Sequence, residues 1–329
     1  MIAVDQSVQR ELRLVTLDAG RAPSIHNTQP WLFISSARGL RIRADRRRQL
    51  SIVDPDGRQL LISCGCALFN ARVSATAAGL RPRVRRFPSR VDADAVADIA
   101  IVGDGSAAAR PSVGRLQPFI EVRQTNRRRF AADPVPAGLV SALAAAARAE
   151  HTELIHVADP VDRSVIADLA QYADRIELLD PAYRAEVRAW TTNDPERRDG
   201  VPALVVPRVG PPSLDELPMR DFDSYGAGFL PAVTASSTEQ CLLLLTTADD
   251  DRMSWLRCGE ALERVLLEVA RNGFTARPFS QLIEVPTTRV QLRTELRLAG
   301  HPQLLLQVGR AAPTPGTGRR PLREVLTER

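Results

Sequence analysis

The sequence contains no lysine, so all 44 of its basic residues are arginine. This absence excludes a P-loop nucleotide site and Schiff-base chemistry, because both depend on a lysine amine. Any phosphate group that this chain binds must therefore be held by arginine side chains, hydroxyl groups or backbone amides.

Cysteine is scarce and shows no metal-binding pattern. Four cysteines are too few for a disulfide scaffold, and they lack the C-x-x-C spacing of zinc sites. They are Cys64, Cys66, Cys241 and Cys258. The four histidines add no metal-ligand spacing. The sequence also lacks G-x-G-x-x-G and G-x-S-x-G, the signatures of dinucleotide-binding domains and serine hydrolases.

Long apolar runs are missing too. No stretch reaches the roughly 18 consecutive apolar residues of a membrane span, and no targeting segment is recognisable. With 44% hydrophobic and 25% charged residues, the composition is that of a globular protein. We expect a cytoplasmic protein that does not bind membranes.

The net charge of +5 raises the question of a nucleic-acid partner. The arginines are scattered over residues 41–48, 81–86, 123–129 and 319–320 and are not gathered on one predicted helix. Scattered charge does not favour a continuous surface for a polyanion. We therefore expect no nucleic-acid binding, and a basic surface patch is the alternative.

The chain contains a weak internal repeat. Residues 64–80 align without a gap on residues 258–274, at a constant offset of 194. Both segments place apolar residues at helical spacing and end at a glycine suited to a helix C-cap. Each is followed by a β-like segment that ends in glycine, at residues 98–103 and 304–309. The pattern favours a duplication; two buried helices that merely share small residues are the alternative.

The repeat predicts an α+β protein made of two halves. Each half is expected to contain a leading helix, a strand, a long core helix and a return strand. The first half covers residues 1–117 and the second covers residues 118–329. Residues 180–235 are rich in proline and glycine, and we expect them to form a long loop inserted in the second half. Such a loop is either a lid over a site or disordered; we favour the lid.

Residues 22–33 read Ala-Pro-Ser-Ile-His-Asn-Thr-Gln-Pro-Trp-Leu-Phe. This segment resembles the A-P-S-x-x-N-x-Q-P-W-x-F segment of the nitroreductase superfamily. In that family the Pro-Ser-x-x-Asn part packs beside the ring of bound FMN and comes from the opposite subunit of a dimer. The resemblance implies this role for Pro23, Ser24 and Asn27. The alternative is a turn that places its aromatic residues in the core.

Two arginine-containing segments resemble the phosphate-binding elements of the same family. Residues 123–136 resemble an R-x-S-x-R-x-F run followed by D-P-V-P, and residues 318–322 resemble the basic tail. A phosphate requires charge-assisted donors, which arginine supplies. The resemblance implies FMN contacts from Arg123, Thr125, Asn126, Arg127, Arg319 and Arg320. A solvated arginine run is the alternative, and the arginine that meets the phosphate stays undetermined.

Residues 277–281 follow the second core helix. Family members carry a Pro-x-Glu-Gly turn there, and a backbone amide of this turn faces flavin N5. Ser280 and Gln281 occupy the Glu-Gly positions in this chain. A backbone amide can serve with any side chain, but the departure changes the pocket for nicotinamide and substrate.

The family's elements are divided between the two halves. The first half has the ring-packing segment and lacks an arginine-rich opening, whereas the second half has the phosphate elements and lacks a ring-packing segment. We therefore predict one FMN per chain, a degenerate second site, and a monomer that is an intramolecular pseudo-dimer.

The inserted segment, with Asp-Gly-Val-Pro at residues 199–202, makes the chain similar to the Acg branch of this superfamily. The resemblance implies an FMN-dependent oxidoreductase that passes hydride from NAD(P)H to the flavin and on to a small acceptor of unknown identity. The alternative is a flavin-storage protein whose lid blocks NAD(P)H.

Overall fold

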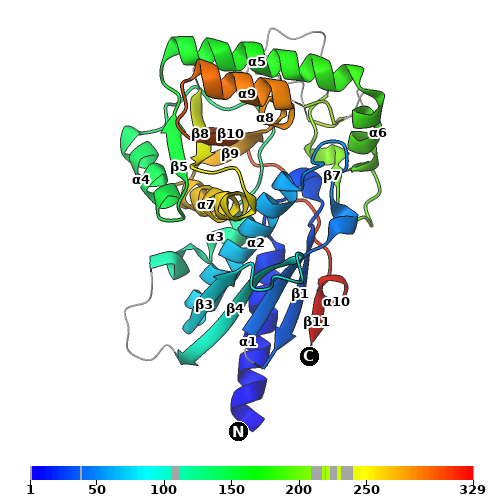
Figure 1. Cartoon of the computed structure of the whole chain (residues 1–329), viewed down its shortest axis with the longest axis vertical. Helices are drawn as coiled ribbons and strands as arrows, with labels where there is room; N and C mark the ends of the chain where they lie inside the picture. Colours follow the sequence, from blue (N-terminus) through cyan, green and yellow to red (C-terminus); the bar gives the residue numbers. More distant parts are fainter. Residues whose placement is uncertain are drawn as a thin grey trace.

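The computed structural model describes residues 2–37, 39–104, 112–208, 217–218, 220–222, 228–230 and 240–328. The first of two sheets is antiparallel except for one parallel pair, the second is antiparallel throughout, and helices α2 and α7 lie between them (Figure 1). Helix α2 spans Arg58–Ala77 and helix α7 spans Arg252–Arg271. The two helices pack directly against each other and form the centre of the largest hydrophobic core.

The first sheet has the strand order β11-β1-β2-β4-β3. Its strands are β1 (Trp31–Ser36), β2 (Gly39–Ala44), β3 (Leu80–Arg86), β4 (Ala95–Asp104) and β11 (Leu326–Glu328). Side chains of β1 alternate between buried and half-buried, because helices α1 (Ile2–Gly20) and α2 cover one face of the sheet.

The second sheet has the strand order β5-β8-β10-β9. Its strands are β5 (Glu153–His156), β8 (Cys241–Thr247), β9 (Thr275–Phe279) and β10 (His301–Gly309). Strands β8 and β10 are buried along nearly their whole length, because helices cover both faces. Leu243 joins the core with α7 and α4 (Ala137–Arg148), whereas Leu244 joins a second core with α5 (Pro160–Leu179) and α9 (Pro286–Glu295).

The two sheets share one topology. The order β1-β2-β4-β3 corresponds to β5-β8-β10-β9, with antiparallel pairing throughout and a central helix after the second strand. Gly79 and Gly273 follow the two central helices with φ of +80° and +72°, so both glycines expected at helix C-caps are confirmed. The β-like segments expected at 98–103 and 304–309 lie in β4 and β10.

Helices α2 and α7 cross at two glycines. A Cβ atom on Gly65 would lie 2.1 Å from the carbonyl oxygen of Leu256, and one on Gly259 would lie 2.0 Å from that of Ile62. Both pairs are related by the offset of 194 residues seen in the sequence, so the contact is reciprocal. Helix α2 also has the length and apolar composition of a membrane span, but 89% of the apolar window is buried inside the protein, as in a core helix.

The end of the chain returns to the first sheet. Strand β11 pairs in parallel with β1, and Phe33 faces Leu326. Helix α10 (Leu322–Val325) leads into this strand. The first sheet is therefore completed by a strand from the far end of the sequence.

The segment inserted between β5 and β8 is only partly a loop. The expectation of a loop over residues 180–235 is wrong for α6 (Pro181–Ala189), which follows α5 directly. Pro181 begins this helix, because proline is tolerated in the first turn, and the Asp180 side chain caps it by accepting from the amide of Ala182. The short strands β6 (Thr191–Thr192) and β7 (Val201–Pro202) follow. Residues 209–216, 219, 223–227 and 231–239 lie outside the described residues.

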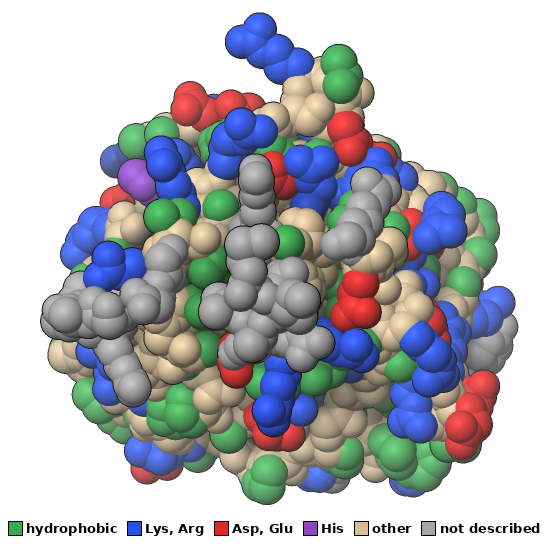
Figure 2. Space-filling model, turned by 90° about the horizontal axis from the view of Figure 1, so that it is seen from below, with side chains coloured by type: hydrophobic (Ala, Val, Ile, Leu, Met, Phe, Trp, Pro, Cys, Tyr) green, Lys and Arg blue, Asp and Glu red, His purple; other side chains and the backbone are tan. Residues whose placement is uncertain are grey.

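Charges of both signs share the surface. On the face seen from below, arginine side chains are interspersed with acidic and hydrophobic ones (Figure 2). Several arginines of the first sheet are paired: Arg41 lies 2.6 Å from Asp98, and Arg43 lies 3.0 Å from Asp92. Such exposed pairs contribute little to stability.

Candidate functional site

Two adjoining cavities lie between elements of the first half and elements of the second half. The first, here the apolar cavity, is bounded by residues 23–26, one face of α2, Phe222 of the insertion, and residues 277–281. The second, here the arginine cavity, is bounded by residues 120–127, residues 315–319 and part of the 21–27 segment. Pro23, Ser24, Thr125 and Arg127 line both cavities, so the two spaces adjoin each other.

The structure brings together most of the residues that the sequence singled out. The predicted residues that line one or both cavities are Pro23, Ser24, Asn27, Arg123, Thr125, Arg127, Ser280, Gln281 and Arg319. Asn126 and Arg320 do not line either cavity. The 22–33, 123–127, 277–281 and 318–320 segments are thus neighbours in space.

The arginine cavity holds more positive than negative charge. Its lining includes four arginines and one carboxylate, that of Glu121, which lies 3.0 Å from Arg21. Arg123 is buried and lies 3.5 Å from Glu263, whereas Arg319 is half-buried. Burial and the charge of Arg123 lower the pKa of Arg319 to about 9, and burial raises the pKa of Glu263 to about 7. The Arg319 guanidinium donates to Asn27 Oδ1, to Thr317 and to the carbonyls of Gly318 and Arg21, and the Arg123 guanidinium donates to the carbonyl of Arg21. All of these acceptors are neutral, so the excess positive charge favours a bound anion.

Arg127 is the least compensated of these arginines. Enclosure lowers its pKa to about 10, with a further contribution from Arg220. Within the part of the chain that the structure describes, Arg127 forms no hydrogen bond or ion pair; its guanidinium lies 4.9 Å from the centre of the Phe222 ring. Its position between the two cavities makes it available to a ligand that fills both.

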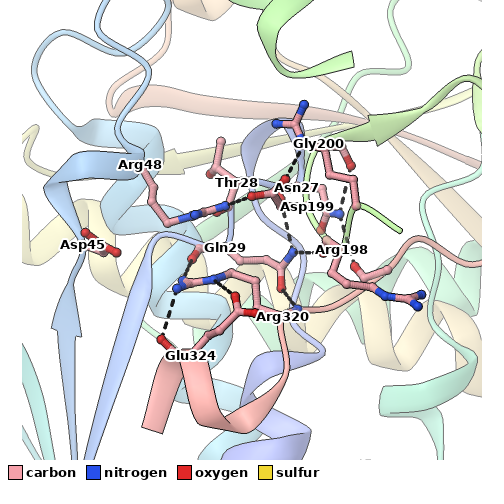
Figure 3. Close-up of polar contacts among 12 residues, drawn as sticks. Asn27, Thr28, Gln29, Asp45, Arg48, Arg198, Asp199, Gly200, Arg320 and Glu324 are labelled. Carbon is pink, nitrogen blue, oxygen red and sulfur yellow. Dashed lines mark hydrogen bonds and ion pairs between the residues drawn. The ribbon is translucent and has the colours of Figure 1, made fainter. Parts of the chain in front are cut away.

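Asn27 holds the wall of the arginine cavity together. Its Nδ2 donates to the carbonyls of Gly200 and Gly318 at 3.0 and 3.2 Å, and its Oδ1 accepts from Arg319 at 3.2 Å (Figure 3). The side chain therefore joins the first half to the insertion and to the C-terminal segment. Its contribution to a bound ligand is to position Arg319.

Arg320 belongs to the same set of connections and not to the cavity. Its backbone amide donates to Gln29 Oε1 at 2.8 Å, while Gln29 Nε2 donates to the carbonyl of Arg198 at 2.8 Å (Figure 3). The Arg320 guanidinium lies near Glu324, with 3.5 Å between the nearest charged atoms. Arg320 lines neither cavity, so its position does not support the expectation that it reaches a phosphate.

Asn126 is also engaged locally. Its Nδ2 donates to the carbonyl of Ala312 at 2.8 Å, and its Oδ1 accepts from the amide of Arg128 at 2.9 Å. These bonds stabilise the turn that presents Thr125 and Arg127. Thr125 itself forms a parallel bridge with Ala276.

The 24–29 segment has an unusual backbone. His26, Asn27 and Gln29 have φ of +44°, +54° and +49°, a region that non-glycine residues rarely adopt. Ser24 Oγ accepts from the amide of Gln29 at 2.9 Å, and Ser63 Oγ accepts from the amide of Ile25 at 3.2 Å. The surrounding structure thus fixes a strained turn at the edge of the cavity, as is common at functional sites.

The opposite wall of the apolar cavity is the 277–281 segment. Gln281 Nε2 donates to Asp174 and Glu177 of α5 at 3.0 Å each, so its side-chain amide is engaged by α5. Ser280 Oγ accepts from Arg220 at 3.4 Å. With both side chains occupied by protein partners, the backbone is what this segment offers to a ligand.

Arg220 and Phe222 of the insertion complete the apolar cavity. Arg220 is buried, forms an ion pair with Glu284 of α8 (Gln281–Glu284), and lies 2.8 Å from His26 Nε2. Phe222 is also buried, and its ring meets that of His26 edge to face, with centroids 5.4 Å apart. The insertion thus contributes to the wall of the site.

Sequence reasoning missed the contribution of α2. The cavity is lined by Gln59, Ile62, Ser63 and Cys66, which follow one another at helical spacing on a single face. Helical periodicity identifies such a face, but a buried face that lines a cavity has the same pattern as one that packs in a core. Cys66 is a fully buried thiol whose pKa is raised well above its usual range by burial, so it is not a reactive thiolate.

Comparison with known proteins gives the chain a family. No protein-family model matches it. It is 34% identical over 325 residues to the Mycobacterium tuberculosis H37Rv protein named "Putative NAD(P)H nitroreductase Rv3131", covering 96% of this chain and 90% of that protein. It is 32% identical over 321 residues to "Putative NAD(P)H nitroreductase acg" of the same strain, covering 94% and 92%. The chain belongs to the nitroreductase superfamily.

Solved nitroreductases resemble the chain more distantly. A nitroreductase with bound FMN from Desulfitobacterium hafniense DCB-2 covers 64% of this chain and 96% of its own, at 12% identity and a TM-score of 0.41. The assignment rests on the full-length relatives, and the chain has the α+β nitroreductase-like fold of its superfamily.

Proposed function

We propose that this nitroreductase-superfamily chain is an FMN-dependent oxidoreductase that holds one flavin across the two adjoining cavities. The observation that carries the proposal is the excess of positive charge at the arginine cavity, where Arg123 and Arg319 have mostly neutral hydrogen-bond partners. These arginines lie next to a cavity whose walls include Phe222 and Leu262. A ligand with one anionic end and one flat, largely apolar end matches this arrangement.

Buried donors without partners support the fit. Within the described chain, Arg319 Nε at the arginine cavity, and Gln59 Nε2 and His26 Nδ1 at the apolar cavity, have no hydrogen-bond partner. Unpaired buried donors are rare in folded proteins and call for a ligand or solvent. FMN carries acceptors at both ends, phosphate oxygens at one and ring carbonyls at the other.

In this proposal Arg319, Arg123 and Thr125 bind the phosphate. Arg127, between the cavities, stabilises negative charge on the ring. Pro23 and Ser24 pack beside the ring, and the backbone at Ser280 faces its opposite edge. FMN supplies the redox chemistry that lets NAD(P)H reduce a small acceptor. The chain's own residues orient the ring, exclude water and supply positive charge.

We also infer that the two halves form an intramolecular pseudo-dimer with one working site. At the offset of 194 residues, Cys66 of the apolar cavity corresponds to Glu260, and Ser280 corresponds to Arg86. Glu260 is fully buried and accepts hydrogen bonds from Arg72 and Arg86 at 2.6 to 2.9 Å. An ionic cluster therefore fills the region that corresponds to the cavity, which accounts for one flavin per chain.

The test is the affinity for FMN and for riboflavin, which lacks the phosphate. Arg319→Met should lower the affinity for FMN roughly 10- to 100-fold, because a charge-assisted hydrogen bond to the phosphate is lost, and should leave that for riboflavin nearly unchanged. Arg46→Met is the matched control, since Arg46 pairs with Asp94 on the surface. Equal affinities for FMN in the Arg319 variant and the wild type would contradict the phosphate assignment.

A storage protein is the second candidate function. The observation that favours it is the burial of Arg220 and Phe222 at the apolar cavity, which leaves less room for a nicotinamide. Anaerobic mixing of the FMN-loaded protein with NADH or NADPH separates the two functions. Rapid bleaching of the flavin supports the oxidoreductase, whereas a flavin that stays oxidised supports storage.

A further inference from the structure

The imidazole of His26 has one nitrogen with a partner and one without. It lines the apolar cavity and is only 6% exposed. Its Nε2 lies 2.8 Å from a terminal guanidinium nitrogen of Arg220. A guanidinium has only donor hydrogens, so this contact is a hydrogen bond only if Nε2 accepts.

The position of the imidazole proton follows. Burial and the neighbouring charges of Arg220 and Arg127 hold the pKa of His26 well below its usual range, so the ring is neutral at pH 7. A neutral imidazole carries a single N–H, and the bond made by one nitrogen decides where it lies. With Nε2 as acceptor, the proton is on Nδ1.

That Nδ1–H is an unused donor. Nδ1 is buried and, among the residues that the structure describes, has no hydrogen-bond partner. Around the imidazole lie the Phe222 ring, at 5.4 Å between centroids, and the unpaired guanidinium of Arg127. An aromatic face, a positive charge and a fixed donor together suit a flat ring that carries oxygen acceptors.

We propose that His26 binds the cavity's ligand through Nδ1–H, which donates to a carbonyl or nitro oxygen of a flat ring, and that Arg220 fixes this tautomer. The identity of the ligand rests on the proposed function: the oxygen belongs to the flavin ring or to the electron acceptor. Arg220 acts through His26 and is therefore a positioning residue.

The first experiment reads the tautomer without any ligand. Long-range proton–nitrogen correlation spectra of isotope-labelled histidine distinguish the Nδ1–H form, the Nε2–H form and the cation. The His26 signals are assigned by their loss in His26→Gln. The wild type should show the Nδ1–H form, and Arg220→Met should shift His26 toward the Nε2–H form. An Nε2–H or cationic His26 in the wild type would overturn the proposal.

The second experiment asks which ligand takes the bond. FMN and then acetophenone are added to the labelled protein, and the Nδ1 signal is followed. A shift on adding FMN assigns the acceptor to the flavin ring, and a shift only on adding acetophenone assigns it to the electron acceptor. No shift with either compound would overturn the proposal.

A matched pair of probes measures the bond. In α-methylstyrene a CH₂ group replaces the carbonyl oxygen of acetophenone with little change of shape. If the acceptor takes the bond, the preference for acetophenone should be roughly three- to tenfold greater in the wild type than in His26→Phe. His156→Phe is the control, because His156 is exposed and distant in the sequence from the cavity segments. If FMN takes the bond, the affinity for FMN should fall by the same factor in His26→Phe.

The outcomes separate this inference from the proposed function. A protein that shows the Nδ1–H tautomer and responds to acetophenone but does not bind FMN would refute the flavin and keep the His26 site. A protein that binds FMN through Arg319 but shows the Nε2–H tautomer would support the flavin site and refute the His26 proposal.

Discussion

The proposed flavin site and the ionic cluster occupy corresponding positions in the pseudo-dimer. Equivalent elements form a cavity at one position and a filled core at the other. Among the described residues, the cavity arginines Arg123, Arg127 and Arg319 form one ion pair with a carboxylate, between Arg123 and Glu263. In the cluster, three arginines surround two buried carboxylates. Its members are Arg72, Arg86, Glu150, Glu260 and Arg264. The difference teaches that the pairing of arginines, more than their number, distinguishes a binding site from a filled core.

The largest effect is expected when the ionic cluster is disrupted. Glu260→Gln should lower the free energy of unfolding by about 3–5 kcal/mol, because Arg72 and Arg86 lose the carboxylate that compensates them. Urea denaturation measures this change. Glu153→Gln, at an exposed position of β5, is the control and should change stability little. A loss of less than 1 kcal/mol in Glu260→Gln would show that the cluster is not a structural core.

Buried carboxyl groups near the cavities should make the stability of the protein depend on pH. Burial raises the pKa of Glu263 in the folded protein to about 7, above its usual 4.5. The folded state then binds more protons between these values, so the free energy of unfolding should fall as the pH rises from about 4.5 to 7, by up to about 3 kcal/mol. Glu177, whose pKa burial also raises to about 7, adds to the same trend.

Stability against urea at pH 5 and pH 7.5 measures this dependence. Glu263→Gln cannot titrate and should lose part of the fall, leaving the part due to Glu177, Asp54 and Asp174, whose pKa values burial also raises. An identical pH dependence in Glu263→Gln and the wild type would contradict the assignment of this carboxyl group.

Replacing a cavity arginine tests whether it contributes to stability as the arginines of the ionic cluster do. Arg127→Met should change the stability of the ligand-free protein by less than 1 kcal/mol or increase it, because no carboxylate among the described residues loses a partner. Its affinity for FMN should fall roughly tenfold or more. Measurements of unfolding and of FMN binding on the same variant decide both points. A loss of several kcal/mol of stability would show that Arg127, like Arg72, is needed for the stability of the fold.

The last prediction concerns the crossing of α2 and α7, where the two halves are equivalent. Gly65→Ala and Gly259→Ala should each cost about 1–3 kcal/mol, because each new Cβ meets a carbonyl oxygen of the other helix. Gly138→Ala in α4 is the control, since no other group lies within 4 Å of the position that its new methyl group would take, and it should be neutral or slightly stabilising. Thermal unfolding compares the three, and unequal costs for Gly65 and Gly259 would argue against reciprocal packing.

Much of the fold could be predicted where the two halves repeat the same local sequence features. The C-cap glycines Gly79 and Gly273 require positive φ, and that requirement is visible in the sequence. The strands at residues 98–103 and 304–309 follow from their apolar character. Helix α6 could not be predicted from composition, because Pro181 can either end a helix or begin one, and Asp180 at the cap decides between them.

The site could be predicted only in part, for a similar reason. An arginine in a basic motif can line a cavity, as Arg319 does, or lie outside it, as Arg320 does beside Gln29 and Glu324. Neighbours in sequence share the motif but not the direction of their side chains. Residues such as Arg220 and Gln59 reach the cavity through tertiary packing, which no local pattern encodes.

The most direct test of the account is a calorimetric titration of the full chain with FMN and with riboflavin. We predict one FMN per polypeptide, because the ionic cluster fills the region that corresponds to the cavity. We also predict a markedly weaker interaction with riboflavin, because the proposed site binds the phosphate that riboflavin lacks. Two FMN per polypeptide, or equal affinities for the two flavins, would contradict it.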